Sequence, residues 1–298
     1  MISSLFVGYC IYYIFKVLYP YINKYIFWLA ILLPQFLIWT GVTTKELLSV
    51  ALFSLFIKQV INIINEEKVA KLTLILAGTI GVFLRPHYGI SYLYLLVSTI
   101  IIVNIIKGRT KVPSTSKRVV LSIFLIILLI FIYLFILAIN YWDYAVEDLM
   151  SLSKDYFTGF SGSSTRYSLA SNWNSAMDFI TYIPTGFFVS LVGPTLNESI
   201  ERPMFFVAFF EGVLYIAICI YLYFILLLKT LNFRSNLFIT LVLYSFFPAL
   251  ILILFAHYPL GIWNPGTALR YRQNMVPLMI FFPLLLLGLQ NKLTTQET

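Results

Sequence analysis

Charged residues are scarce in this chain. They make up 11% of its 298 residues, whereas hydrophobic residues make up 60%. A soluble domain carries about 25% charged residues, so an ordinary soluble domain is excluded. The apolar runs do not alternate with polar residues, which excludes a membrane β-barrel. Runs such as 119–140 are long enough to cross a hydrocarbon core about 30 Å thick. The expected fold is therefore all-α, a polytopic transmembrane helical bundle.

Residues that bind metals or form disulfides are also few. The two cysteines, Cys10 and Cys219, both fall in hydrophobic runs, and the two histidines, His87 and His257, are too few for a metal cluster. The chain has no phosphate-binding Walker loop, no Gly-x-Ser-x-Gly elbow and no dinucleotide fingerprint. We expect no metal site and no resident cofactor, with a transient divalent metal left open.

The apolar runs predict nine spans in one integral membrane domain, residues 1–298. They are 2–19, 25–40, 47–64, 70–84, 88–106, 119–140, 204–228, 237–256 and 274–290. The third run carries Lys58, and its alternative interpretation is an amphipathic helix lying in the membrane interface.

Basic residues set the expected orientation. Segment 107–118 carries five basic residues and no acid, so it should be cytoplasmic. The next span then leads to a long extracytoplasmic loop with short helices, roughly 141–203. Segment 257–273 also becomes an outer connection, the C-terminus is cytoplasmic and the N-terminus is extracytoplasmic. Most of the net charge of +8 lies in loops that serve this orientation, so nucleic acid is not expected as a partner.

A set of basic residues falls at the expected outer face, where the charge rule disfavours them. It comprises Lys45, Arg85, His87, Arg270 and Arg272. The rigid fork of donors in arginine suits a phosphate or diphosphate. The alternative is pairing with loop acids or lipid head groups, which we favour for Lys45. For Arg270 with Arg272 we favour ligand contact, because residues two apart on a helix cannot both face one acid.

Three further residues are expected to support the binding site. Glu211 is a carboxylate inside a span, which is costly; it is expected to pair with a neighbouring helix, to orient one of the arginines or to carry a proton. Tyr271 separates the two arginines and must point away if both flank a pocket, and Asn264 opens their segment. Pro86 should keep Arg85 out of the helical region, either as a plain helix stop or as part of a phosphate clamp.

Short motifs in a fixed order give the chain a family resemblance. They are Leu33-Pro34 to Trp39-Thr-Gly41, Lys45-Glu46, Leu84-Arg85-Pro86, Pro184-x-Gly-x-Phe, Gly193-Pro194, Glu211-Gly212 and Asn264 to Arg272 with Pro277. Together they resemble polytopic proteins of bacterial surface-polysaccharide clusters, namely O-antigen or capsule polymerases and class C glycosyltransferases. The resemblance implies a multi-pass protein of the bacterial plasma (inner) membrane. It also implies two kinds of partner, membrane lipids and a polyprenyl-phosphate or polyprenyl-diphosphate sugar that the chain binds at the outer face.

One departure from that family bears on catalysis. Class C enzymes typically begin with a cytoplasmic N-terminus, one span and an outer loop that bears a catalytic carboxylate, whereas this chain begins directly with a span. We therefore expect an N-terminally truncated form, and the catalytic residue is unknown, since none of the acids in loop 141–203 stands out as a general base. Three hypotheses remain: a membrane glycosyltransferase or polymerase, a transporter or flippase of lipid-linked sugars, and a non-catalytic truncated membrane protein.

Overall fold

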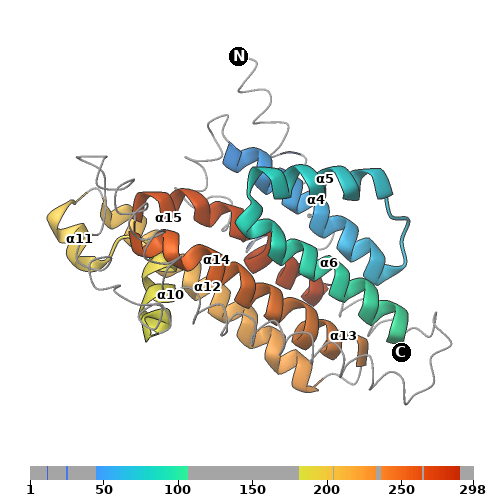
Figure 1. Ribbon diagram of the computed structural model, residues 1–298. Helices are drawn as coiled ribbons and strands as arrows, with labels where there is room; N and C mark the ends of the chain where they lie inside the picture. Colours follow the sequence, from blue (N-terminus) through green and yellow to red (C-terminus); the bar gives the residue numbers. More distant parts are fainter. Residues whose placement is uncertain are drawn as a thin grey trace.

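The computed structural model describes Tyr12, Tyr25 and residues 45–106, 181–203, 205–232, 236–263 and 265–288. These ranges are mostly helical, with short turns between the helices, and contain no strand, which confirms the all-α class for the described part of the chain (Figure 1). The predicted spans 2–19, 25–40 and 119–140 lie outside the described residues apart from the two isolated tyrosines, as does 141–180 of the predicted long loop.

Four helical stretches in the described ranges are long and apolar enough to cross a membrane. They are α4 (Lys45–Asn65), α6 (Pro86–Ile106), Phe205–Leu231 within α12 (Phe205–Asn232), and Leu237–Tyr258, which runs through α13 (Asn236–Leu241), η2 (Val242–Phe246) and α14 (Phe247–Trp263). They coincide with the predicted spans 47–64, 88–106, 204–228 and 237–256. The predicted fourth span forms α5 (Lys71–Leu84), which is apolar but shorter. The total of nine spans stays a prediction.

Small residues let α5 pack closely on α4. A Cβ atom added at Gly78 would lie 3.1 Å from the Phe56 ring, and one at Gly81 would lie 2.9 Å from the Phe53 ring. Small residues at such positions are typical of helix pairs in membranes, because they allow the backbones to approach. Since α4 is buried along most of its length, the structure favours a helix inside the bundle over one that lies in the interface.

The corner between α5 and α6 lies at Arg85. This residue has φ −144° and ψ 70°, outside the helical region, and Pro86 begins α6. Proline is suited to a first helical position because its missing N–H would have no partner there. The prediction that Pro86 keeps Arg85 out of the helix is confirmed.

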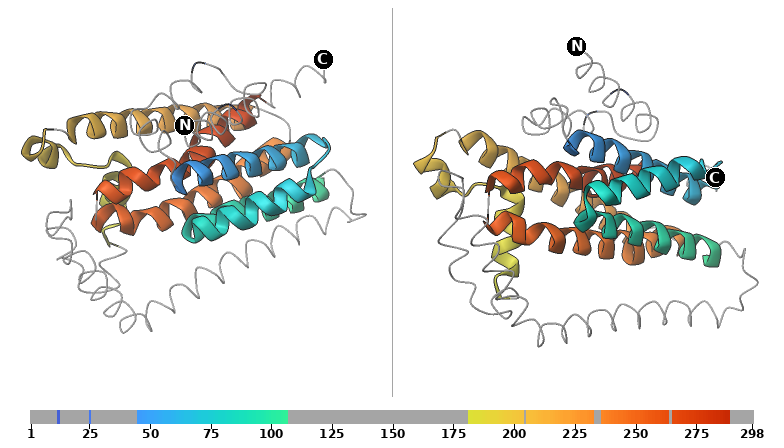
Figure 2. Two further views of the ribbon diagram at one scale, coloured as in Figure 1. Left: turned by 90° about the horizontal axis from the view of Figure 1, so that it is seen from above. Right: turned by 45° about the horizontal axis from the view of Figure 1, so that its top comes forward.

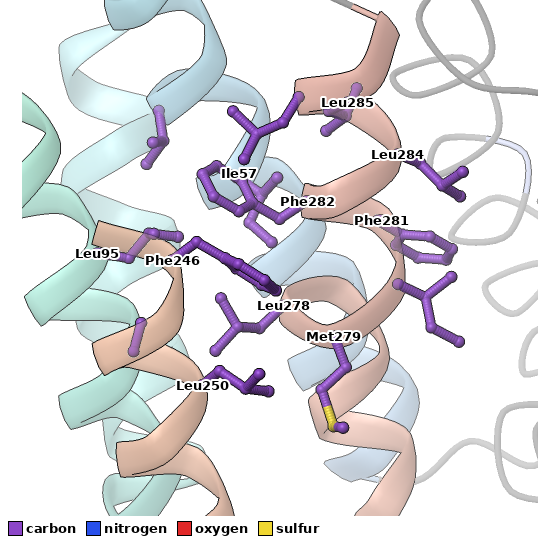
Figure 3. Packing of buried hydrophobic residues seen from close by; sticks show 14 of the residues in the cluster. Ile57, Leu95, Phe246, Leu250, Leu278, Met279, Phe281, Phe282, Leu284 and Leu285 are labelled. Carbon is purple, nitrogen blue, oxygen red and sulfur yellow. The ribbon is translucent and has the colours of Figure 1, made fainter. Parts of the chain in front are cut away.

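The helical run from Pro265 to residue 288 places its apolar part at the centre of the bundle. It contains α15 (Pro265–Arg272), η3 (Gln273–Met275) and η4 (Pro277–Phe281), followed by helix over 282–288. Every residue from Met275 to Leu286 is buried. Figure 3 shows side chains of this segment facing Ile57, Leu95, Phe246 and Leu250 from three other helices.

Two π-helical turns interrupt the central helices, and tyrosines from neighbouring helices bind their carbonyls. The Tyr94 hydroxyl donates to the Tyr244 carbonyl in η2 at 3.0 Å. The Tyr223 hydroxyl donates to the Met279 carbonyl in η4 at 3.1 Å. A carbonyl left without a partner in a membrane interior is costly, so these bonds stabilise the irregular turns.

The described part of the predicted long loop contains a short helix, α10 (Ile183–Val192). This helix runs across one end of α12 and α14 (Figure 2). Two glycines allow this crossing. A Cβ atom at Gly212 would lie 1.8 Å from the Val192 carbonyl oxygen, and one at Gly261 would lie 2.0 Å from the Ser190 Cβ. A shorter helix, α11 (Leu196–Glu201), follows after a turn. The expectation of short helices holds for the described part of this loop.

Candidate functional site

Two arginines and one glutamate form a partly buried cluster where three separate elements meet. Glu46 lies in the first turn of α4, Arg85 at the α5–α6 corner and Arg270 near the end of α15. Arg85 Nη2 and Arg270 Nε both donate to Glu46 Oε1, the second at 2.7 Å, and Arg270 Nη2 donates to Oε2 at 3.3 Å. We call these three residues the outer cluster, after the membrane face at which the predicted topology would place them.

Exposure differs sharply within the outer cluster. The Glu46 side chain has no exposed surface and that of Arg85 is 7% exposed, whereas that of Arg270 is 41% exposed. Arg270 therefore has one edge against a buried carboxylate and part of its surface on the outside of the described structure. Of the three side chains, Arg270 is the one placed to meet a ligand.

Tyr271 lies against the outer cluster. The Arg85 guanidinium carbon is 4.2 Å from the centre of the Tyr271 ring, and the His87 ring centre is 5.9 Å from it. A guanidinium over an aromatic face is attracted to the π-electrons. Tyr271 was required to point away if Arg270 and Arg272 both flank a pocket, and this condition is not met, since the Arg270 guanidinium carbon lies 5.9 Å from the Tyr271 ring centre. Arg85 Nε and His87 Nε2 are buried and have no hydrogen-bond partner among the described residues.

Arg272 belongs to a second cluster on the other side of α15. Its Nη2 lies 3.3 Å from Glu211 Oε1, its Nη1 donates to the Leu191 carbonyl at 2.7 Å, and its guanidinium carbon lies 5.3 Å from the Tyr215 ring centre. Both side chains of the ion pair are 1% exposed. Burial lowers the pKa of the Arg272 guanidinium and the Glu211 carboxylate opposes this; an arginine keeps its charge under such conditions.

The two arginines thus face different acids. Residues two apart on a helix are separated by about 200° of rotation, so Arg270 and Arg272 point to opposite sides of α15. Two of the roles expected for Glu211 hold together, since it pairs with a neighbouring helix and orients an arginine. Buried in this ion pair, Arg272 is better placed to hold helices together than to meet a ligand.

The segment that carries both arginines differs from the sequence expectation. Within the predicted outer connection 257–273, α14 continues to Trp263 and α15 begins at Pro265, so the segment is helical; its location outside the membrane stays a prediction. Pro265 is suited to the first helical position of α15. Ion pairs on both faces of α15 then hold this helix in place. Asn264, expected as a support, lies outside the described residues.

His257 is buried and joins α14 to two neighbouring helices. The Tyr88 hydroxyl lies 2.7 Å from its Nδ1, and its Nε2 lies 3.2 Å from the Ser190 carbonyl oxygen. A tautomer with the proton on Nε2 donates to that carbonyl and accepts from Tyr88. His257 and Arg272 therefore bind two successive carbonyls near the end of α10, where helix carbonyls lack partners.

Lys45 and Glu46 have different places although they are adjacent. Lys45 is exposed at the start of α4, whereas Glu46 is entirely buried. Sequence reasoning did not assign a role to Glu46, because the partners of the arginines were sought among the loop acids. Of those acids, Glu198 instead caps α11: its side chain accepts from the Thr195 N–H at 2.6 Å, and Thr195 in turn accepts from the Glu198 N–H at 3.3 Å.

No group of three or more His, Cys, Asp or Glu side chains that would hold a metal ion occurs in the part of the chain that the structure describes. No protein-family model, no curated protein and no solved structure matches the chain. Its function is therefore argued from its own motifs and from the geometry of the two clusters.

Proposed function

We propose that the chain is a membrane glycosyltransferase or polysaccharide polymerase that acts on undecaprenyl-linked sugars at the outer face of the bacterial plasma membrane. In this proposal Arg270 binds the phosphate or diphosphate of the lipid-linked sugar. The observation that carries the proposal is the exposure of Arg270 beside a wholly buried carboxylate.

The charge of the outer cluster supports an anionic ligand. Two guanidinium groups from different elements converge on one carboxylate. Arginine matches the oxygens of a phosphate with several donors at once. In the nine-span topology Arg85 and Arg270 lie at the outer face, at the depth of a lipid phosphate.

The roles of the acids follow from their contacts. Both oxygens of Glu46 accept hydrogen bonds from arginine, which stabilises the charged carboxylate and makes it a poor proton acceptor. A different carboxylate, not yet assigned, would activate the hydroxyl of the sugar acceptor. Glu211 and Arg272 would keep α15 in place, and Lys45 and His87 lie near enough in the chain to the cluster to contact other parts of the lipid head group.

The test is Arg270→Ala, with Arg202→Ala as the matched control. Arg202 is an exposed arginine at the end of α11, and its contact is the Phe205 ring, 5.9 Å away. We expect Arg270→Ala to abolish surface-polymer formation in a producing host. In nanodiscs it should weaken the binding of a polyprenyl phosphate at least tenfold, which corresponds to a loss of about 1.4 kcal/mol in binding free energy. Arg202→Ala should leave both unchanged.

Normal polymer with Arg270→Ala, at the normal membrane level of the protein, would contradict the proposal. A vesicle assay with labelled lipid-linked sugar separates the alternative. Movement of the lipid across the bilayer without glycosyl transfer would assign the chain as a transporter instead.

A further inference from the structure

We propose that Glu46 is a positioning residue of the lipid-phosphate site: it holds Arg85 and Arg270 together and directs Arg270 toward the ligand. This inference rests on the proposed function, because it concerns the same anionic ligand. It adds a residue to which the arguments from sequence gave no role.

The geometry places Glu46 behind the arginines rather than beside the ligand. Arg85 and Arg270 donate to the same oxygen, Oε1, although they come from the α5–α6 corner and from α15. Because the Glu46 side chain has no exposed surface, a ligand arriving on the exposed side of Arg270 does not touch it. Any effect of Glu46 on the ligand therefore passes through Arg270.

Two donors on one carboxylate also fix the direction of Arg270. Its Nε and Nη2 bind Oε1 and Oε2 at 2.7 Å and 3.3 Å, a two-point contact that sets the plane of the guanidinium group. Without the negative charge, Arg85 and Arg270 repel each other at short range. Arg85 is enclosed, whereas Arg270 is partly exposed, so Arg270 is the side chain that would turn away from the site.

Comparison with the second cluster separates this role from that of an ordinary ion pair. Glu211 meets one arginine, Arg272, and both side chains are 1% exposed. Glu46 meets two arginines, and one of them is 41% exposed. The Glu211 pair is closed within the bundle, whereas the Glu46 carboxylate joins an enclosed arginine to one that reaches the surface.

The experiment measures the dissociation constant of polyprenyl monophosphate with the full chain in nanodiscs. It compares the parent protein with Glu46→Gln, Arg270→Gln and the double variant. We expect Glu46→Gln to weaken binding about tenfold. Because Glu46 acts through Arg270, adding Glu46→Gln to Arg270→Gln should cause no further loss. The matched control is Glu67→Gln, which alters an acid 3.9 Å from Lys58 beyond the opposite end of α4 and should not change the dissociation constant.

The outcomes separate the inference from the proposed function. Failure of the parent protein to bind the lipid overturns both. If the parent protein binds and Glu46→Gln binds equally well or more tightly, the proposed function stands and the positioning role is refuted. Independent, additive losses in the double variant refute it too. Should Glu46→Gln fail to fold, Glu46→Asp keeps the charge but shortens the reach; weakened binding supports the inference, and unchanged binding overturns it.

Discussion

Removing the charge of Glu211 should destabilise the protein strongly. The charged atoms of Arg272 and Glu211 lie 3.3 Å apart, and two unit charges at that separation attract by about 5 kcal/mol at an effective dielectric constant of ~20. Glu211→Gln keeps the shape of the side chain and an oxygen that can accept a hydrogen bond. Arg272 also retains its bond to the Leu191 carbonyl at 2.7 Å. Since breaking a buried ion pair costs about 3–5 kcal/mol, we expect a loss near the lower end, ~3 kcal/mol.

Thermal unfolding in detergent, followed by size-exclusion chromatography of heated samples, measures this loss. A change of 1 kcal/mol shifts the midpoint of a chain of this size by about 2–4 °C, so a drop of roughly 6–12 °C is expected. Glu201→Gln, an exposed acid at the end of α11, is the control and should stay close to the parent. Adding Arg272→Met to Glu211→Gln should restore much of the stability, because no unpaired charge then remains buried. A shift for Glu211→Gln no larger than that of the control would refute the reasoning.

Two smaller perturbations test how α10 is held. Gly212→Ala places a Cβ atom 1.8 Å from the Val192 carbonyl oxygen and should cost at least ~2 kcal/mol; Gly78→Ala, whose Cβ would lie 3.1 Å from a phenylalanine ring, is the milder comparison, and equal midpoints for the two would argue against the tight crossing. Tyr88→Phe removes the 2.7 Å hydrogen bond to His257 and should cost about 1–3 kcal/mol. Unchanged thermal unfolding of that variant would show that the histidine finds another partner.

Much of the described fold follows from local sequence signals. Four apolar runs became the long helices, because a run of about 20 apolar residues has few alternatives to a membrane-spanning helix. The α5–α6 corner followed from the constraint that Pro86 places on Arg85. The helix α15 was missed, because its polar residues show no apolar period. Its two arginines are held by acids distant in sequence, which local patterns do not reveal.

The site was predictable only as a set of cations. The predicted topology assigned Arg85 and Arg270 to one face, and the structure joins them on one carboxylate. The carboxylate itself was not predicted: Glu46 is 39 residues from Arg85 and 224 from Arg270. A glutamate in the first turn of a helix is already explained by the helix dipole, so nothing in its local sequence marks a second role.

The three arginines that the charge rule disfavours at the predicted outer face differ in how they are paired and in how far they are exposed. In the two clusters three arginines meet two carboxylates: Glu211 balances Arg272, and Glu46 is shared by Arg85 and Arg270. Exposure then separates the three guanidinium groups. The side chains of Arg272 and Arg85 are 1% and 7% exposed, against 41% for Arg270. In the proposed function an anion would reach the cluster at Arg270, so the two arginines of α15 would have different roles: Arg272 would hold the helix in place and Arg270 would bind the ligand.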